Sequence, residues 1–289
     1  MKHFGVIGQP IAHSLSPLLH NTAFSLLELD CRYDAILVEP SSLPSALRDF
    51  KSREFAGLNV TIPHKETIVS LVDELSDEAK AVGAVNTLSF TNDRARGDNT
   101  DVYGIAQSLD AFRKDFDQQA VLVLGAGGSA RATTYALLTR FSPAEITVAN
   151  RGLTRARDLI AHFDRYARGT RLRALPLSHE TIGRAVERAS LIINATPVGM
   201  FPSVGSSPVD EKVRFHSGQT VLDLIYTPLQ TRFLDSAARD GARTISGLEM
   251  FLYQGARSFE LWLGRQMPVD DVRPVILNEL NKRERSHTS

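Results

Sequence analysis

The chain has 289 residues with 33 basic and 33 acidic side chains, so its formal net charge at neutral pH is zero. This balance excludes a strong overall field that would attract nucleic acid or an anionic membrane. Hydrophobic residues make up 43% and charged residues 23%, which is typical of a soluble globular protein. The length exceeds that of one ordinary domain and predicts two. Because the net charge is zero, any anionic ligand must be bound by groups placed locally at its site.

The same composition excludes several kinds of metal and membrane protein. Cys31 is the only cysteine, so an internal disulfide and a cysteine metal cluster are impossible. The eight histidines never take a ligand spacing such as H-E-x-x-H, and we predict no metal site. A strand pattern begins at residue 3, which leaves no room for a signal peptide, and no apolar run reaches membrane-spanning length. We therefore expect a cytoplasmic enzyme that acts on a small molecule, with no nucleic-acid or membrane partner.

The first hundred residues alternate between strand and helix patterns. The strand candidates are residues 3–8, 33–38, 55–62 and 84–90, and the helix candidates between them are residues 17–29, 42–51 and 76–82. Such alternation predicts an α/β domain with a largely parallel sheet. We place this first domain at residues 1–103.

Two hydroxyl side chains, Ser14 and Ser16, lie in the loop after the first strand. They can donate hydrogen bonds to one ligand carboxylate without burying an unpaired positive charge. The alternative for Ser16 is a structural one, because Ser16-Pro17 is a strong helix start with serine as the N-cap. The sequence leaves both interpretations open.

Further polar residues follow the later strands of the first domain. The third strand has a polar face that includes Thr61, and Lys65 follows where the carboxyl end of a parallel strand would place a ligand. Asn86 is predicted within the fourth strand, where a buried amide needs a partner. Asp101 comes after that strand and either belongs to the site or only caps the helix that begins there. Lys65 is either a site residue or an exposed lysine.

A glycine-rich turn stands at the centre of the second half. Residues 121–124 are all apolar and predict a strand buried on both faces, and helical spacing resumes at residues 132–140. The turn between them lets the backbone approach a pyrophosphate, while free N–H groups at the helix start receive its charge. This pattern predicts a Rossmann-type domain at residues 104–246. The alternative is a tight turn without a ligand. The predicted contacts in the turn are Gly125, Ala126, Gly127, Gly128 and Ser129.

The end of the next strand, residues 145–150, indicates which dinucleotide is bound. An NAD site usually has a carboxylate there for the ribose 2′-hydroxyl, whereas an NADP site offers cationic groups to the 2′-phosphate. This strand ends in Asn150-Arg151, Arg155 follows, and no carboxylate occurs before Asp158. The pattern favours NADP. Arg157 belongs to this cluster or faces solvent.

Two more buried strands, residues 190–195 and 221–226, have polar residues at their carboxyl ends, where the nicotinamide half of a dinucleotide would lie. A helix with a broad apolar face then begins near residue 247. Gln254 is the polar residue on this helix, and it belongs to a site or faces solvent. The predicted cofactor contacts in this part of the chain are Thr196, Ile225 and Gly247.

Motifs in a fixed order run along nearly the whole chain. They are Gly8-Gln9-Pro10, Ser14-x-Ser16-Pro17, Asn59-Val60-Thr61-x-Pro63-x-Lys65, Ala84-Val85-Asn86-Thr87, Asn99-Thr100-Asp101, Gly125-Ala126-Gly127-Gly128, Asn150-Arg151, Asn194-Ala195-Thr196-Pro197, Gly199-Met200, Asp223 with Tyr226 and Pro228, and Gly247-Leu248 with Met250 and Gln254. This set resembles the shikimate dehydrogenase family. The chain departs from the family pattern at Gly152, Thr227 and Glu249.

The resemblance implies an N-terminal α/β substrate domain, a Rossmann-type NADP domain, and C-terminal helices at residues 247–289 that pack back on the first domain. It implies reversible reduction of 3-dehydroshikimate to shikimate with NADPH, as in the biosynthesis of aromatic amino acids. Lys65 and Asp101 would form the catalytic pair, and Asn150, Arg151 and Arg155 would bind the adenosine end of the cofactor. The implied substrate contacts are Ser14, Ser16, Thr61, Asn86, Asp101, Tyr226 and Gln254.

Other functions remain open at this point. A quinate/shikimate dehydrogenase of catabolic type with relaxed cofactor use is the nearest alternative, and an aminoshikimate-type relative is another. A sensor that binds metabolite and dinucleotide without turnover is disfavoured because both Lys65 and Asp101 are present. A folate-type dehydrogenase would not explain the paired serines. The oligomeric state stays open between a monomer and a homodimer.

Overall fold

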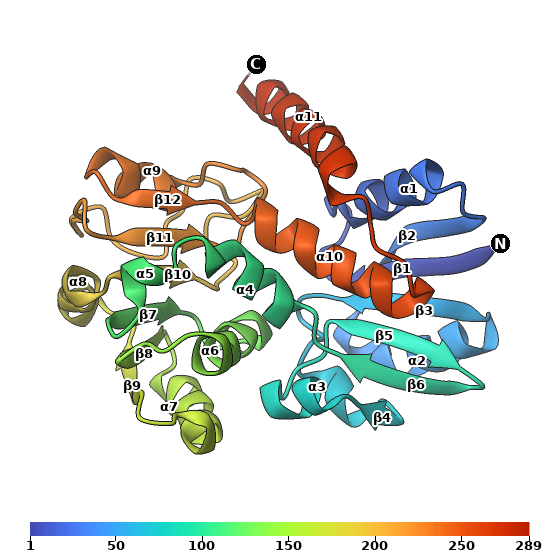
Figure 1. Ribbon diagram of the computed structural model, residues 1–289, viewed down its shortest axis with the longest axis horizontal. Helices are drawn as coiled ribbons and strands as arrows, with labels where there is room; N and C mark the ends of the chain where they lie inside the picture. The colour runs from blue at the N-terminus through green and yellow to red at the C-terminus, as the bar shows by residue number, and fades with distance from the viewer. Residues whose placement is uncertain (289) are drawn as a thin grey trace. The chain divides into compact units, whose positions relative to one another are not determined.

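The computed structural model describes residues 1–288, and the chain divides into two compact units (Figure 1). Unit 1 contains residues 1–104 together with the chain from Leu252 onward, and unit 2 contains Ile105–Phe251. The assignment of substrate binding to residues 1–103, of NADP binding to residues 104–246 and of a returning helical segment to residues 247–289 stays a prediction.

The sheet of unit 1 is mixed, with the strand order β2-β1-β3-β5-β6-β4. The first three strands in this order run parallel, but β5 pairs antiparallel with both β3 and β6. Strand β4 pairs parallel with β6, so three of the five pairs are parallel, and the expected parallel arrangement fails only at the two pairs that β5 makes. The strands are β1 (Lys2–Gly8), β2 (Cys31–Leu37), β3 (Phe55–Val60), β4 (Glu74–Leu75), β5 (Thr87–Thr91) and β6 (Arg94–Asp98).

A tight hairpin accounts for this difference. Asn92 and Asp93 connect β5 to β6, and both have positive φ, at 49° and 59°. Two positive φ angles define the two-residue turn whose twist matches an antiparallel hairpin, and Asn and Asp tolerate that conformation. The chain therefore returns directly as β6, a strand that we did not predict.

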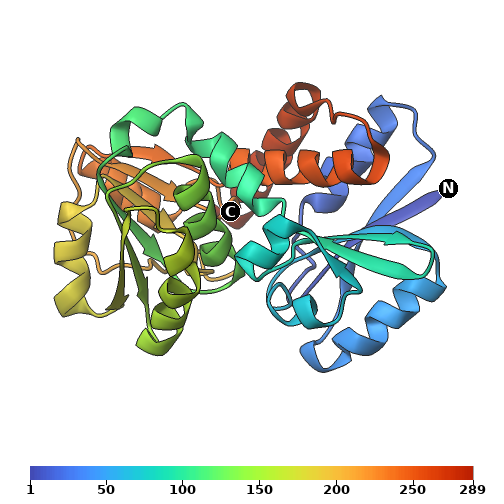
Figure 2. The ribbon, with the colours of Figure 1, turned by 60° about the horizontal axis from the view of Figure 1, so that its bottom comes forward.

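Helices cover both faces of this sheet. Figure 2 shows α1, α10 and α11 on one face and α2 on the other. The bounds are α1 (Ser16–Leu26), η1 (Pro40–Ser42), α2 (Leu43–Ser52), η2 (Thr67–Ser70), α3 (Asp77–Val82), α4 (Asp101–Asp110), α10 (Leu248–Leu263) and α11 (Val269–Thr288).

Glycines let α10 pack closely on the rest of unit 1. A Cβ at Gly57 would lie 2.2 Å from Nε1 of Trp262, and that Nε1 donates a hydrogen bond to the carbonyl of Leu88 at 2.8 Å. On α10 itself, a Cβ at Gly255 would lie 2.4 Å from Leu19. The C-terminal helices thus pack back on the first part of the chain, which confirms this feature of the implied fold.

A histidine lies unpartnered in the core between α1 and α10. The His20 ring is fully buried and stacks on Tyr33 with centroids 4.3 Å apart, beside Phe24 and Trp262. Both ring nitrogens lack a hydrogen-bond partner. Burial disfavours the imidazolium and lowers the pKa of His20 to about 3.

Because of His20, we expect the free energy of unfolding to fall as the pH is lowered. The unfolded chain takes up a proton on this histidine below its ordinary pKa of ~6.5, whereas the folded chain does not until about pH 3. Stability is therefore lost between these two values. Between pH 7 and pH 5 the expected loss is about 2 kcal/mol.

Denaturant unfolding of wild type and His20→Leu at both pH values measures this contribution. The variant should lose about 2 kcal/mol less than wild type on going from pH 7 to pH 5. The exposed His13 provides the control, and His13→Gln should keep the wild-type dependence. A pH dependence in His20→Leu equal to that of wild type would show that His20 takes up its proton equally well in the folded and the unfolded chain.

The sheet of unit 2 is entirely parallel in the pairs described, with the strand order β12-β11-β10-β7-β8-β9. This is the doubly wound Rossmann-type order, and it confirms the predicted fold of this half. The strands are β7 (Ala120–Leu124), β8 (Glu145–Asn150), β9 (Arg171–Pro176), β10 (Leu191–Asn194), β11 (Thr220–Asp223) and β12 (Arg243–Ile245). The helices are α5 (Arg113–Phe116), α6 (Gly128–Arg140), α7 (Leu153–Phe163), η3 (Asp164–Tyr166), α8 (His179–Arg188) and α9 (Arg232–Arg239).

The strand order fixes where a ligand fits. The chain moves outward from β7 to β8 and β9, and then returns to β10 on the other side of β7. In open parallel sheets, ligands bind outside the carboxyl ends of the strands at such a reversal. The loops after β7 and β10 both lie at this point. Strands β9 and β12 were not predicted.

Candidate active site

The start of α1 resolves the two interpretations of Ser16. The helix begins at Ser16 itself with Leu15 as the N-cap, and no side chain caps it. The backbone N–H of Ser16 instead donates to Oγ of Ser14 at 3.2 Å. The structural alternative, Ser16 as the N-cap, is therefore wrong. Ser16 is 7% exposed, and its hydroxyl is not used to cap the helix.

A charged pair lies at the carboxyl end of β3. Nζ of Lys65 donates to Oδ2 of Asp101 at 2.6 Å, and the two side chains are only 12% and 3% exposed. The carbonyl of Lys65 accepts from the N–H of Val85 at 2.8 Å, which anchors the lysine backbone beside the strand that follows. Lys65 is thus not an ordinary exposed lysine.

Asn86 connects this pair to α10. Its Nδ2 donates to Oδ1 of Asp101 at 2.7 Å and lies 3.4 Å from Oε1 of Gln254. The backbone N–H of Thr100 donates to Oδ1 of Asn86 at 2.7 Å. Since a backbone N–H can only donate, this bond sets the amide orientation and turns its NH₂ group toward the carboxylate. Asn86 itself lies just before β5 rather than within it.

The structure therefore brings together four predicted residues that are far apart in the sequence. Both carboxylate oxygens of Asp101 are engaged, one by Lys65 and one by Asn86, so capping of α4 is not their main use. Gln254 points from α10 toward the same amide rather than only toward solvent. A buried ammonium, a carboxylate and two amides form a polar centre within unit 1.

Thr61 occupies a tight position after β3. A Cβ at Gly8 would lie 2.4 Å from Cγ2 of Thr61, so only glycine fits opposite it. The backbone N–H of Thr61 donates to the carbonyl of Ile7 at 2.9 Å, which holds the residue beside β1. Contact of Thr61, Ser14 and Ser16 with a substrate stays a prediction.

The glycine turn in unit 2 has the geometry of an anion site. Gly125 has a φ of +107°, and a Cβ there would lie 3.0 Å from the carbonyl oxygen of Ala195 in the loop after β10. Helix α6 begins at Gly128 with Gly127 as its N-cap, and no side chain caps its first turn. The first N–H groups of a helix need acceptors, and a pyrophosphate supplies them. Contacts with Ala126, Ser129 and the turn glycines stay predictions.

The residues predicted for the adenosine end lie at the end of β8 and just after it. Nδ2 of Asn150 donates to the carbonyl of Gly152 at 3.0 Å, and Arg151 and Arg155 are exposed beside the start of α7. Two cationic groups thus lie on the exposed surface at the end of β8. Arg157 has a different position, because it lines a cavity of about 570 Å³ with Arg184 and other residues of α8.

A buried aspartate that we did not predict as a site residue organises the other nucleotide loops. Asp223 at the end of β11 accepts hydrogen bonds from Asn194 at 3.0 Å and from Thr231 at 2.7 Å. Oδ1 of Asn194 in turn accepts from the hydroxyl of Thr196 at 2.7 Å. Burial raises the pKa of Asp223 to about 6. These bonds fix the loop that carries Thr196.

The other residues of unit 2 that we predict as contacts, Ile225, Tyr226 and Gly247, come later in the sequence than the loop that carries Thr196. A Cβ at Gly247 would lie 2.4 Å from the carbonyl oxygen of Leu224, so no side chain fits there. Ile225 is buried, and Tyr226 stacks on Phe251 with centroids 4.2 Å apart. The hydroxyl of Thr227, a position at which the chain departs from the family pattern, is buried without a partner. The roles of Tyr226 and Ile225 stay predictions.

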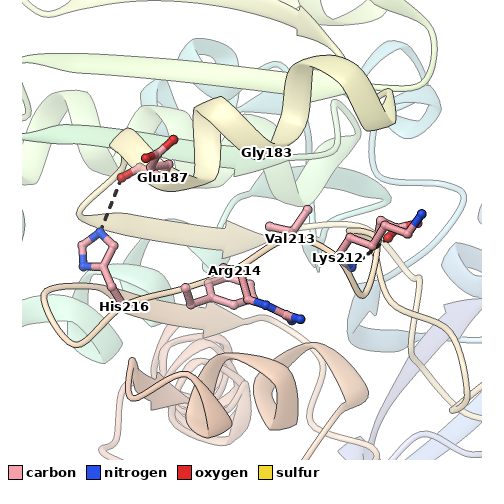
Figure 3. Close-up of a pocket in the computed structure, with 8 residues that line it drawn as sticks. Gly183, Glu187, Lys212, Val213, Arg214 and His216 are labelled. Carbon is pink, nitrogen blue, oxygen red and sulfur yellow. Dashed lines mark hydrogen bonds between the residues drawn. The ribbon is translucent and has the colours of Figure 1, made fainter.

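A separate cavity lies between α8 and residues 210–216 and contains none of the predicted residues (Figure 3). Its volume is about 450 Å³, and the His216 ring closes one side by donating to the carbonyl of Glu187 at 3.4 Å. Among the side chains that the structure describes, no three His, Cys, Asp or Glu residues lie together as metal ligands. No helix in the described part of the chain has both the length and the apolarity needed to cross a membrane.

Three family models match successive parts of the chain. The shikimate dehydrogenase substrate binding domain matches residues 6–88, and the shikimate / quinate 5-dehydrogenase model matches residues 106–210. The shikimate 5′-dehydrogenase C-terminal domain matches residues 247–277. Along the chain, the substrate binding domain match comes first, the shikimate / quinate 5-dehydrogenase match second and the C-terminal domain match last.

Individual proteins resemble the chain over nearly its full length. Shikimate dehydrogenase (NADP(+)) of Methanopyrus kandleri is 41% identical over 280 residues, which cover 96% of this chain and 95% of that protein. Shikimate 5-dehydrogenase of Thermus thermophilus, solved in complex with NADP(H) and shikimate, has a TM-score of 0.82 at 36% identity, covering 95% of this chain and 98% of that one. Quinate dehydrogenase of Corynebacterium glutamicum in complex with NAD has a TM-score of 0.85 at 28% identity, with coverages of 96% and 99%. The chain belongs to the shikimate dehydrogenase family.

Proposed function

We propose that this protein catalyses the reversible NADPH-dependent reduction of 3-dehydroshikimate to shikimate. The observation that carries the proposal is the buried Lys65–Asp101 pair, held at 2.6 Å beside the amide of Asn86. A lysine and an aspartate in this arrangement provide a proton donor and a group that orients it. Two relatives that are 41% and 40% identical over more than nine tenths of the chain are named shikimate dehydrogenase (NADP(+)).

Lys65 acts at the carbonyl oxygen of the substrate. When NADPH is bound, it supplies the hydride that reduces the C3 carbonyl. Negative charge then develops on the oxygen, and the Lys65 ammonium provides both a compensating charge and a proton. Asp101 holds the ammonium in place and can accept a hydrogen bond from a neighbouring substrate hydroxyl. In the reverse direction, neutral Lys65 accepts the hydroxyl proton.

Hydroxyl and amide groups bind the rest of the substrate. Ser14 and Ser16 donate to its carboxylate, and the observation that supports this role is the Ser16 hydroxyl, which is buried but does not cap α1. Neutral donors suit an anion in a partly dry pocket because they leave no unpaired cation when the site is empty. The other proposed contacts are Thr61, Asn86, Tyr226 and Gln254.

The residues of unit 2 fit NADP. The uncapped start of α6 and the close approach at Gly125 suit a pyrophosphate, and Arg151 and Arg155 suit the 2′-phosphate. The charge distribution agrees with this role, since residues 105–251 carry 18 basic and 14 acidic side chains. The rest of the chain carries 15 basic and 19 acidic side chains, so the neutral total conceals a cationic nucleotide unit.

The proposed function is tested with purified protein and nicotinamide absorbance. Shikimate and quinate are each combined with NADP⁺ and with NAD⁺. We expect strong turnover only for shikimate with NADP⁺. Comparable rates with quinate or NAD⁺ would assign the protein to the catabolic class with relaxed cofactor use. Absence of turnover in all four pairings, with both ligands still bound, would indicate a sensor.

Lys65→Ala should lower kcat by about 10² or more, because a general acid contributes on this scale. The KM for shikimate should change little, since the serines and amides still bind the substrate. Lys51 offers a matched control, because it also pairs with an aspartate, Asp73, at 2.6 Å but lies outside the site. Steady-state kinetics of Lys65→Ala and Lys51→Ala make the comparison. Near-normal turnover in Lys65→Ala would contradict the assignment.

Arg151→Ala should weaken NADP⁺ binding by about tenfold or more, because a charge-assisted hydrogen bond to the phosphate is lost. NAD⁺ has no 2′-phosphate, so its binding should hardly change. Titration calorimetry with both dinucleotides measures the two affinities, and Arg188→Ala, an exposed arginine of α8, serves as the control. Equal losses for NADP⁺ and NAD⁺ would refute the phosphate role of Arg151.

A further inference from the structure

Three buried hydroxyl groups form a triangle beneath the polar centre of unit 1. The oxygens of Thr87 and Thr100 are 3.1 Å apart, Thr87 and Ser258 are 2.9 Å apart, and Thr100 and Ser258 are 3.1 Å apart. All three side chains are at most 2% exposed. Thr87 begins β5, Thr100 precedes α4, and Ser258 lies on α10, so the triangle joins three separate segments.

One side of this hydroxyl triangle holds the amide of Asn86. Nδ2 of Asn86 donates to the hydroxyl oxygen of Thr100 at 2.9 Å, and the backbone of Thr100 donates to Oδ1 of Asn86. The hydroxyl of Thr87 lies 3.1 Å from the same Oδ1. The backbone N–H of Thr100 and the two threonine hydroxyls therefore together hold the direction in which Asn86 presents its NH₂ group to Asp101.

The opposite side of the triangle meets a second amide, that of Asn59. Its Nδ2 donates to the carbonyl of Asn86 at 3.2 Å, and since a carbonyl only accepts, the NH₂ group faces the triangle. The same nitrogen donates to Ser258 at 2.9 Å. Tyr33 donates its hydroxyl proton to Oδ1 of Asn59 at 2.7 Å, which completes the amide's bonds.

Ser258 is the only member of the triangle that comes from the end of the chain. Its Oγ also donates to the carbonyl of Gln254 one turn earlier on α10, at 3.1 Å. Without this oxygen, Nδ2 of Asn59 keeps the carbonyl of Asn86 and the hydroxyl of Thr87, at 3.2 and 3.1 Å, but loses its nearest acceptor. Each threonine hydroxyl also loses one partner, so the hydrogen bonds that Thr87 shares with Asn59, Thr100 and Asn86 are redistributed and the hold on Asn86 is weakened.

We propose that Ser258 is a positioning residue, which acts through Thr87 and Thr100 to hold Asn86 against Asp101. The proposal rests on the proposed function, because it assumes that the Lys65–Asp101 pair performs the chemistry. Ser258 belongs to none of the motifs of the sequence analysis. Its hydroxyl couples the position of α10, and hence of Gln254, to the geometry of the catalytic pair.

The first test is Ser258→Ala, and we expect kcat with shikimate to fall about tenfold, as small misplacements of catalytic groups do. The KM for NADP⁺ should stay within a factor of about two, because unit 2 is not altered. Phe259→Leu is the matched control, since Phe259 is the next residue on α10 and fully buried but packs among aromatic rings. This variant should lose stability while keeping its kcat. Equal kcat losses in both variants would overturn the proposal.

A second pair of variants separates the hydroxyl from packing. Thr87→Val keeps the shape of the side chain but removes its hydroxyl, whereas Thr87→Ser keeps the hydroxyl but removes a methyl group. If the triangle positions Asn86, Thr87→Val should lower kcat about tenfold and Thr87→Ser should retain at least half of it. The reverse order would show that packing alone matters. If Ser258→Ala does not fold, the two Thr87 variants still test the proposal.

A crystal structure of Ser258→Ala, or of Thr87→Val, gives a readout that does not depend on the reaction. We expect the distance from Nδ2 of Asn86 to Oδ1 of Asp101, which is 2.7 Å in wild type, to exceed hydrogen-bonding range. A retained hydrogen bond would overturn the positioning role. If wild type is inactive with shikimate, the proposed function is refuted. The positioning role is still tested in that case, because the Asn86–Asp101 distance can be compared between wild type and variant without any reaction.

Discussion

The polar centre of unit 1 depends on the burial of one ion pair. An ammonium and a carboxylate removed from water are unfavourable unless each finds a partner and the remaining lone pairs are also hydrogen-bonded. Lys65 satisfies one oxygen of Asp101 and Asn86 satisfies the other. Asn86 in turn needs acceptors and a donor, which Thr100 provides. The amides and hydroxyls around the pair therefore form one connected set, and each member restricts the orientation of the next.

Unit 2 solves the problem of binding an anion in a different way. Its glycine turn offers backbone N–H groups at the start of α6, where the N-cap residue Gly127 has no side chain to cap them. The neighbouring loop is held by Asp223, whose two oxygens accept from Asn194 and Thr231. The turn itself, residues 125–130, contains no charged residue, whereas Arg151, Arg155 and Arg157 follow β8. A protein of zero net charge can thus concentrate positive potential where a phosphate would bind.

Local signals made most of unit 2 predictable, because the apolar run of β7, the glycine turn and the start of α6 are adjacent in the sequence. Asn92-Asp93 is also a local turn signal, and it explains β6 and the antiparallel pairing of β5 with β6. The N-cap of α1 is Leu15 rather than Ser16, because the Ser-Pro pair that predicts a helix start does not fix the position of the cap to within one residue. Ser258 could not have been found, because it lies 158 residues from Thr100 and only the fold places them together. The same holds for His20, whose apolar surroundings come from both ends of the chain.

The discontinuity of unit 1 has a consequence for the order in which the protein is built on a ribosome. Residues 105–251 form one uninterrupted stretch, so their sheet contains every strand it needs as soon as that stretch has emerged. The N-terminal residues are made first but lack Trp262 over Gly57, Gly255 against Leu19 and Ser258 in the hydroxyl triangle. Their apolar surface and their buried polar groups must wait for α10. The part of the protein that is synthesised first therefore cannot complete its core or its hydroxyl triangle until residues 252–263 have been made as well.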